Sequence, residues 1–147
     1  MRVAEIMTRD PEVVTSEFVL KDAALKMREL GVGMLPIRND DRLVGMLTDR
    51  DITIRATAEG RDPTKTQVHE VMTQDMVYCF EDQDVSEAAK LMQEKQIRRL
   101  PILNREKRLV GIVSLGDVAV HSGEKNVVAE TIKEVSEPAE PHRSTES

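Results

Sequence analysis

Two short segments carry the side chains best suited to binding chemistry. Thr48 precedes Asp51 by three residues in "GMLTDRD", and Ser114 precedes Asp117 by the same interval in "GIVSLGD". At a helix start, such a hydroxyl caps backbone N–H groups and such a carboxylate complements the helix dipole. A helix N-terminus also attracts phosphate, and a carboxylate accepts two hydrogen bonds from a ribose diol. The residues alone leave helix capping and ligand binding both open.

The other reactive side chains form no catalytic or metal-binding pattern. His69, His121 and His142 occur in unrelated contexts, without the ligand spacing of a zinc site. Cys79 is the only cysteine and lies in an apolar run, which favours a buried and inert thiol. The sequence has no nucleophile elbow, Walker loop or dinucleotide-binding glycine motif. We therefore expect a protein that is not an enzyme and holds no metal.

The chain consists of two copies of one unit. "VAEIMTRD" at 3–10 matches "VHEVMTQD" at 68–75, and "AALKM" at 23–27 matches "AAKLM" at 88–92 at the same offset. "RLVG" recurs one residue further on, because the second copy has an extra residue in its "NREK" turn. Internal repetition of this kind decides the architecture before any local assignment.

Each copy predicts the order strand, helix, strand, strand, helix. Helical spacing of apolar residues marks the first helix of each copy, with Gly31 as the residue after its end and Asp84 and Glu87 spaced as a capping box. The expected strands lie at 12–15 and 76–80, the helices at 19–30 and 85–95, a hairpin at 34–48 and a closing helix at 49–60.

A single copy has one apolar sheet face that it cannot cover alone. We expect an α/β (α+β) fold in which two copies pack sheet against sheet with pseudo-twofold symmetry, leaving two equivalent clefts. The predicted organisation is repeat 1 at 1–59, a linker at 60–67, repeat 2 at 68–122, a C-terminal helix at 123–136 and a disordered tail at 137–147.

Composition excludes several classes of partner. The net charge is −6 and aromatic residues make up only 2% of the 147 residues, so binding to nucleic acid or to an anionic membrane is not expected. No segment resembles a secretory signal or approaches the length of a membrane span. We expect a cytoplasmic protein.

The recurring motifs resemble those of the cystathionine β-synthase (CBS) domain. These are an "IMT" opening, an "AAxxM" helix, "LPI" and an "LVG" segment that leads to T-x-x-D. The resemblance covers residues 3 to 122 and implies a tandem CBS pair. Such pairs sense adenosine-containing ligands such as AMP, ADP, ATP or S-adenosylmethionine. With no effector domain in the chain, it resembles the stand-alone bacterial type, acting on an unknown regulated protein.

Carried over position by position, the resemblance assigns a ligand-binding role to several residues. It places ribose-binding carboxylates at Asp51 and Asp117, with hydroxyl partners at Thr48 and Ser114. Further lining residues, pairwise equivalent in the two copies, are Thr8 and Thr73, Val13 and Tyr78, Val32 and Ile97, and Met46 and Ile112.

The same geometry distributes these residues between two clefts. Asp117 is expected to share a cleft with Thr8 and Val13, and Asp51 to share the other with Thr73 and Tyr78. Tyr78 either stacks on a purine or fills its cleft.

Charge distinguishes the two copies before "LPI". Copy two has Arg98 and Arg99 where copy one has Gly33 and Met34. Neighbouring strand residues point to opposite faces, so at most one arginine should face a given site. A guanidinium there would make the Asp117 site the better phosphate binder. The alternative is that both are solvated at the surface.

The leading hypothesis is a regulatory module that binds an adenine nucleotide or S-adenosylmethionine as its ligand and requires no cofactor. Whether magnesium accompanies the ligand is left open. The alternative is a ligand-free dimeric interaction scaffold in which the T/S-x-x-D motifs only cap helices. A homodimer is expected in either case, because CBS pairs associate through their helices. Catalysis and metal-dependent sensing come third.

Overall fold

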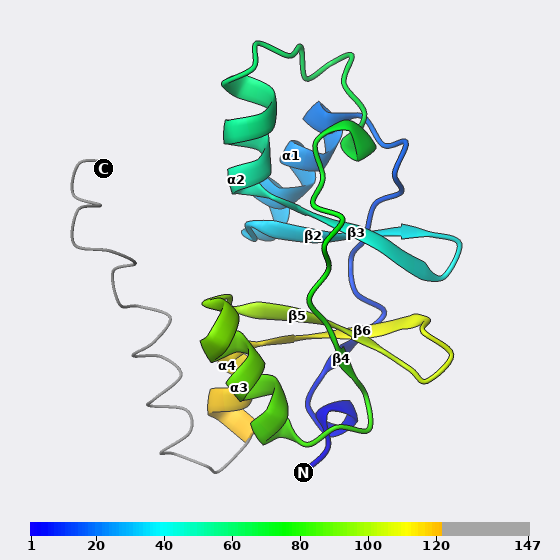
Figure 1. Ribbon diagram of the computed structural model, residues 1–147, viewed down its shortest axis with the longest axis vertical. Helices are drawn as coiled ribbons and strands as arrows, with labels where there is room; N and C mark the ends of the chain where they lie inside the picture. Colours follow the sequence, from blue (N-terminus) through cyan, green and yellow to red (C-terminus); the bar gives the residue numbers. More distant parts are fainter. Residues whose placement is uncertain (122–147) are drawn as a thin grey trace, which may run out of the picture.

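The two repeats form two halves whose hairpins face each other, with helices on the outer sides (Figure 1). The computed structural model describes residues 1–121. The elements of the first repeat are η1 (Val3–Glu5), β1 (Thr8–Arg9), α1 (Leu20–Leu30), β2 (Met34–Asn39), β3 (Arg42–Thr48), α2 (Asp49–Asp51) and η2 (Ile52–Thr57). Those of the second are η3 (Val68–Glu70), β4 (Cys79–Phe80), α3 (Val85–Lys95), β5 (Arg99–Leu103), β6 (Leu109–Ser114) and α4 (Leu115–His121). The predicted α/β fold of two repeats is confirmed. The helix expected at 123–136 and the tail at 137–147 lie outside the described residues.

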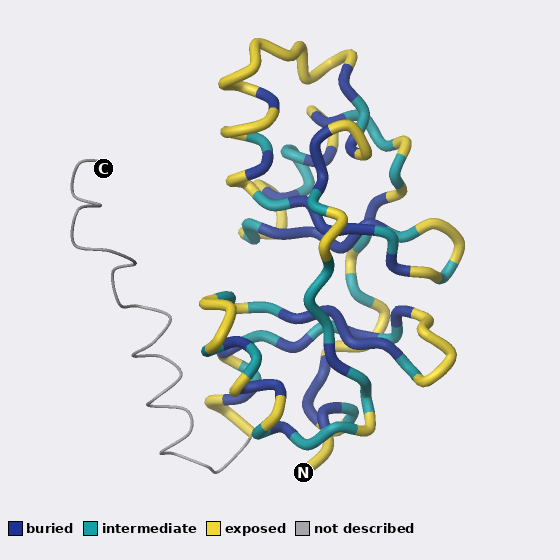
Figure 2. Tube along the Cα trace, viewed as in Figure 1, coloured by how far each residue is buried: buried dark blue, intermediate teal, exposed yellow. Residues whose placement is uncertain are grey.

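The predicted hairpin is present in both repeats. Strand β2 pairs antiparallel with β3, and β5 with β6. Each hairpin has an irregularity at the equivalent place, after Ile37 in the first repeat and after Ile102 in the second. Figure 2 shows that these four strands form the buried middle of the molecule, while the turns that join them are exposed.

The strands expected before each helix are shorter than predicted. Only Val14 of segment 12–15 forms a bridge, a parallel one to Ile37, because the chain turns away at Ser16, whose side chain bonds Asn39. In the second repeat, the expected strand at 76–80 is reduced to β4, which pairs parallel with β5.

The helices agree with the apolar periodicity, but two details differ. Helix α1 ends at Gly31, which has the predicted left-handed conformation with φ of 68°. The helix expected at 49–60 begins as α2 and widens into the π-helical turns of η2, where the Ala58 N–H donates to the Thr53 carbonyl at 2.9 Å. The capping box at α3 is incomplete, since the Glu87 carboxylate accepts from the Gln83 amide at 2.6 Å instead.

The opening segments of the two repeats are exchanged. Strand β1 of repeat 1 pairs with β6 of repeat 2, with Thr8 opposite Ile112. In the reverse direction, Thr73 of repeat 2 forms a bridge to Met46 of repeat 1. Each repeat therefore completes the other.

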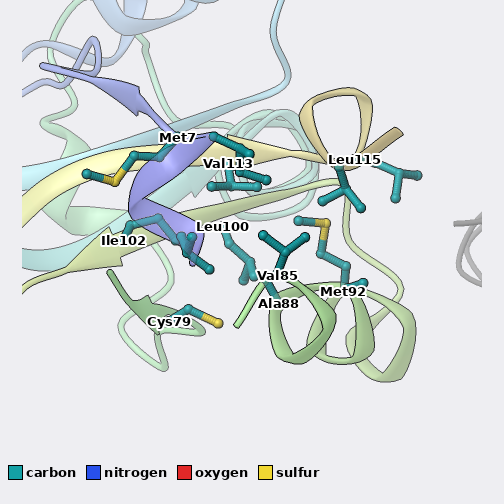
Figure 3. Close-up of a cluster of buried hydrophobic side chains, with 13 residues drawn as sticks. Met7, Cys79, Val85, Ala88, Met92, Leu100, Ile102, Val113 and Leu115 are labelled. Carbon is teal, nitrogen blue, oxygen red and sulfur yellow. The ribbon is translucent and has the colours of Figure 1, made fainter. Parts of the chain in front are cut away.

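The exchange extends into both cores. Val3, Ile6 and Met7 are buried among the side chains of α3, β5 and β6, and Figure 3 shows Met7 beside the strands of the second repeat. Equivalent residues Val68, Val71 and Met72 are buried against α1 and the first hairpin. Full burial of each large aliphatic side chain contributes about 1.5–3 kcal/mol, so neither core is complete without the opposite opening segment.

The exchange requires glycine at two positions, Gly45 and Gly111, the last residues of the two "LVG" triplets. A Cβ atom on Gly111 would lie 2.6 Å from the Met7 sulfur and 2.9 Å from the Thr8 carbonyl oxygen. A Cβ atom on Gly45 would lie 2.7 Å from the Met72 sulfur and 3.0 Å from the Thr73 carbonyl oxygen. The glycines let the backbone of each exchanged segment approach the strand.

We expect Gly111→Ala to lower the free energy of unfolding by about 1–3 kcal/mol, because the methyl group meets a backbone carbonyl that does not yield easily. Gly116→Ala is the matched control: its Cβ would contact only the Ser114 hydroxyl, at 3.6 Å, and alanine favours the helix by up to about 1 kcal/mol. Urea unfolding of both variants tests this, and equal stability of the two would contradict it.

Asp84 anchors the start of α3. Its carboxylate accepts from the Ser86 hydroxyl at 2.6 Å, from the Ser86 N–H at 2.9 Å and from the Met1 ammonium at 3.2 Å. These bonds, that of the Ser86 hydroxyl first, lower the pKa of Asp84 from 3.8 to about 2. The ionised form is therefore the one that the folded state stabilises.

A lowered carboxyl pKa adds stability that is present above pH 3.8 and is lost as the pH falls towards 2. We expect wild type to be more stable than Asp84→Asn at pH 7, with the difference shrinking between pH 4 and pH 2. Urea unfolding across this range measures it. A difference of constant size down to pH 2 would show that the charge of Asp84 is not responsible.

Candidate functional site

Both T/S-x-x-D motifs form the predicted helix caps. The Thr48 N–H donates to the Asp51 carboxylate at 3.0 Å, and the Asp51 N–H donates to the Thr48 hydroxyl at 3.0 Å. Ser114 and Asp117 make the same reciprocal pair at 2.8 and 3.0 Å. Each motif therefore sits at the start of a helix, as the sequence predicted.

The two carboxylates have different surroundings. The Thr73 hydroxyl donates to both oxygens of Asp51, at 3.0 and 3.1 Å, and the Arg55 Nε lies 3.8 Å away. Asp51 is only 6% exposed. The expected pairing of Asp51 with Thr73 is thus present as a direct contact across the two repeats.

Asp117 is half-buried, and its bonds within residues 1–121 are those of the cap with Ser114. Thr8, the equivalent of Thr73, is exposed and makes no side-chain hydrogen bond to Asp117 in this part of the chain. His121 stands at the end of α4 in place of Arg55. The second carboxylate consequently keeps more of its accepting capacity.

Two cavities are lined by residues of both repeats. The first, here called the Thr8 cavity, has a volume of about 410 Å³; it is lined by Thr8, Asp10, Pro11, Glu12, Leu30, Val32, Met34, Leu35, Pro36, Arg99 and Ile112. The second, here called the Thr48 cavity, has a volume of about 370 Å³; it is lined by Gly33, Met34, Met46, Thr48, Gln96, Ile97, Arg98 and Arg99. They are related by the repeat, because Val32 and Ile112 in one correspond to Ile97 and Met46 in the other.

Most of the residues assigned by resemblance lie in or next to these cavities. Thr48 lines its own cavity and bonds Asp51, which in turn bonds Thr73. Ser114 and Asp117 follow Ile112 of the Thr8 cavity on the same strand and the next helix. The chain thus brings the motif, the opening threonines and four apolar residues to the junction of the repeats.

Val13 and Tyr78 lie elsewhere. Both pack on a third apolar cluster formed by Leu43, Leu103 and Leu109. The Tyr78 ring meets Phe80 edge to face, with centroids 5.6 Å apart. Tyr78 lines neither cavity, so this arrangement matches neither of the two roles considered for it, stacking on a purine or filling its cleft.

The two arginines differ from expectation. Both Arg98 and Arg99 line the Thr48 cavity, and Arg99 lines the Thr8 cavity as well. Strict alternation does not apply, because β5 begins at Arg99 and Arg98 precedes the strand. Arg98 therefore lies on the Thr48 side and Arg99 on both sides, so the two arginines do not single out the cavity next to Asp117.

The cavities differ in charge. The lining of the Thr48 cavity holds two arginines and no acidic residue, whereas that of the Thr8 cavity combines Arg99 with Asp10 and Glu12. Phosphate groups are consequently favoured more strongly by the Thr48 cavity.

Other reactive groups of the described chain are accounted for structurally. Burial raises the pKa of the Cys79 thiol to about 11, and the thiol is 2% exposed. His69 is exposed and bonds the Gln67 amide at 2.8 Å. Residues 1–121 contain no cluster of three or more His, Cys, Asp or Glu side chains suited to a metal. No helix in the same range is long and apolar enough to cross a membrane.

Comparison with known proteins agrees with this geometry. The CBS domain family profile matches residues 3–56 and again 68–123. The chain belongs to the CBS domain family. As a CBS pair it is 43% identical over 119 residues to the CBS domain-containing protein YhcV of Bacillus subtilis, covering 81% of this chain and 84% of that protein.

Solved CBS structures share the fold. Hypoxic Response Protein I, whose crystal structure has two coordinated zinc ions, matches with a TM-score of 0.75 and 39% identity over 82% of this chain and 98% of that one. CBSX2 in complex with AMP matches with a TM-score of 0.72 and 26% identity, covering 85% and 98%. The CBS pair of MJ0100, in complex with 5-methylthioadenosine and S-adenosyl-L-methionine, matches with a TM-score of 0.71 and 28% identity, also covering 85% and 98%.

Sequence reasoning missed several lining residues, and three of them bear on the charge or the position of the cavities. Asp10 and Glu12 give the Thr8 cavity its acidic side, and Met34 lines both cavities. Met34 was available as the equivalent of Arg99 in the repeat, but nothing in the sequence indicated that this position faces both clefts.

Thr73→Val should lower the free energy of unfolding by about 1–3 kcal/mol, because it leaves the buried Asp51 carboxylate without the hydroxyl that bonds both of its oxygens. Thr8→Val is the matched variant of the other repeat and should change stability by less than about 0.5 kcal/mol, since Thr8 is exposed. Thermal unfolding of both compares them. If both variants lower the free energy of unfolding equally, the different surroundings of Asp51 and Asp117 do not affect stability.

Proposed function

We propose that this CBS pair is a regulatory binding module for an adenosine-containing ligand such as AMP, ADP, ATP or S-adenosylmethionine. The observation that carries the proposal is the Thr48 cavity, where two arginines lie beside a T-x-x-D helix cap with no acidic residue in the lining. Its volume is within the range of about 300–1,000 Å³ that small-molecule sites occupy.

Each part of such a ligand has a complementary group in this cavity. Met46 and Ile97 offer apolar walls for an adenine, and Arg98 and Arg99 offer guanidinium groups for phosphate. For the ribose, Thr48 lines the cavity with its hydroxyl, and Asp51 lies behind it, 6% exposed. A carboxylate has about four accepting positions, and the bonds from Thr48 and Thr73 do not use all of those on Asp51.

The Thr8 cavity favours a ligand with less negative charge. Asp10 and Glu12 oppose a polyphosphate there, while Asp117 has accepting capacity beyond its cap. The complexes of CBSX2 with AMP and of MJ0100 with 5-methylthioadenosine and S-adenosyl-L-methionine support this range of ligand charge.

Regulation follows from the position of the cavities between the repeats. A ligand that contacts both halves favours the arrangement it fits best, and its differential affinity sets the size of the change. We propose that the change alters contact with a regulated protein, that the pair acts as a homodimer in the cytoplasm, and that no catalytic group or further cofactor is needed.

One observation favours the alternative, an interaction scaffold whose clefts stay empty. The Asp51 carboxylate is 6% exposed and already accepts from the Thr48 N–H and the Thr73 hydroxyl, so capping and repeat contact account for that residue without any ligand.

A thermal-unfolding panel tests the proposal. Wild type is heated with AMP, ADP, ATP, S-adenosylmethionine, adenosine, GTP and NADH, each with and without magnesium. A ligand at 100 times its dissociation constant adds about 2.7 kcal/mol and should raise the unfolding midpoint by several degrees.

Matched variants locate the effect. Arg98→Met should reduce the response to phosphorylated ligands more than the response to adenosine, because Arg98 lines only the Thr48 cavity. Asp117→Asn, which keeps an acceptor for the cap, should weaken responses that depend on the Thr8 cavity. If no adenosine ligand moves the midpoint of wild type, the scaffold function is the correct one.

A further inference from the structure

The two cavities share a wall made of two equivalent residues. Met34 and Arg99 occupy the same position in the two repeats, at the start of β2 and of β5, and each lines both cavities. On the opposite strands, Met34 pairs with Thr48 and Arg99 with Ser114. One charged side chain therefore stands between two sites that are otherwise related by symmetry.

Among the described residues, Arg99 has no partner for its charge. Its side chain is half-buried, and within residues 1–121 no carboxylate forms an ion pair with its guanidinium. A guanidinium grips one phosphate through two parallel hydrogen bonds, which fixes its orientation. This grip uses one edge of the guanidinium, so Arg99 cannot present the same edge to both cavities at once.

We propose that Arg99 makes the two clefts compete for phosphate, so that a phosphorylated ligand in one cleft weakens the binding of a phosphorylated ligand in the other. This inference rests on the proposed function and adds a rule of occupancy to it. A ligand without phosphate does not need Arg99 and is not subject to the competition.

Phosphate bound in the Thr48 cavity engages Arg99 in preference to phosphate bound in the Thr8 cavity. Arg98 adds a second positive charge on that side, whereas Asp10 and Glu12 oppose an anion on the other. A phosphorylated ligand fills the Thr48 cavity first and leaves the Thr8 cavity without its only cation among the lining residues. Couplings between two sites commonly amount to 5–150-fold, and we expect about tenfold here.

The test blocks one cavity and measures binding in the other. Ile97 is half-buried and lines the Thr48 cavity only, so Ile97→Trp should fill it. Backbone amide shifts of Thr8 and Ile112 in ¹⁵N-labelled protein report occupancy of the Thr8 cavity during a titration with AMP. We expect AMP to bind there about tenfold more tightly in Ile97→Trp than in wild type, because Arg99 is released.

Two controls identify Arg99 as the cause. Adenosine, which lacks the phosphate, should bind the Thr8 cavity equally in wild type and Ile97→Trp. Arg99→Met reproduces Met34 on the other side of the shared wall, and in this background Ile97→Trp should no longer strengthen AMP binding. At about 0.15 M salt, direct repulsion between phosphates is largely screened beyond about 8 Å.

The outcomes separate the inference from the function beneath it. If AMP, ADP, ATP, S-adenosylmethionine and adenosine all leave the cavity amides of wild type unshifted, the proposed function fails and the inference with it. If AMP binds but Ile97→Trp leaves its affinity at the Thr8 cavity unchanged, or strengthens it equally without Arg99, only the inference is overturned. If Ile97→Trp does not fold, Arg98→Trp at the exposed rim of the same cavity replaces it.

Discussion

The fold depends on the exchange of opening segments between the repeats. Met7 packs against Gly111 and Met72 against Gly45, and the backbone comes so close that no side chain fits at either glycine. Because each opening segment crosses to the other half, its threonine arrives beside the other half's T/S-x-x-D motif. The location of the clefts at the junction is a direct result of this crossing.

The symmetry that builds two clefts is broken by a few side chains. Asp51 is enclosed by Thr73 and approached by Arg55, whereas Asp117 faces an exposed Thr8 and has His121 at the equivalent helix position. Backbone hydrogen bonds of the exchange are the same in both halves, as in the 2.8 Å bonds from the Val3 and Val68 N–H groups. The backbone arrangement is thus the same in both halves, while the side chains around the two carboxylates differ.

Local patterns allowed the sequence to predict much of this structure. The repeat offset, the apolar spacing of α1 and α3 and the left-handed Gly31 are properties of neighbouring residues, and they were predicted correctly. Both helix caps followed from hydroxyl-to-carboxylate spacing in the same way. The resemblance to CBS domains added the grouping of Thr73 with Asp51, which the structure shows as a direct hydrogen bond. It also grouped Thr8 with Asp117, and no hydrogen bond joins these two side chains within residues 1–121.

Features that depend on long-range contacts could not be predicted from the sequence. The wall shared by Met34 and Arg99 arises from how two hairpins face each other, for which no local signal exists. Val13 and Tyr78 were both assigned to the clefts, but they pack on leucines that come from β3, β5 and β6, far from them in the sequence. The arginines were misjudged because alternation holds only inside a strand, and Arg98 lies before one.

The exchange also explains why a covalent connection between the two repeats matters. Two separate single-repeat chains that traded opening segments would make the same contacts, but their association would depend on protein concentration. The connection at 60–67 makes that association intramolecular, with an effective concentration that short linkers typically set in the millimolar range. Covalent linkage also removes the requirement that both partners be identical, so each half is free to acquire its own residues. Arginine on one side of the shared wall and methionine on the other is a difference that a dimer of two identical single-repeat chains could not have.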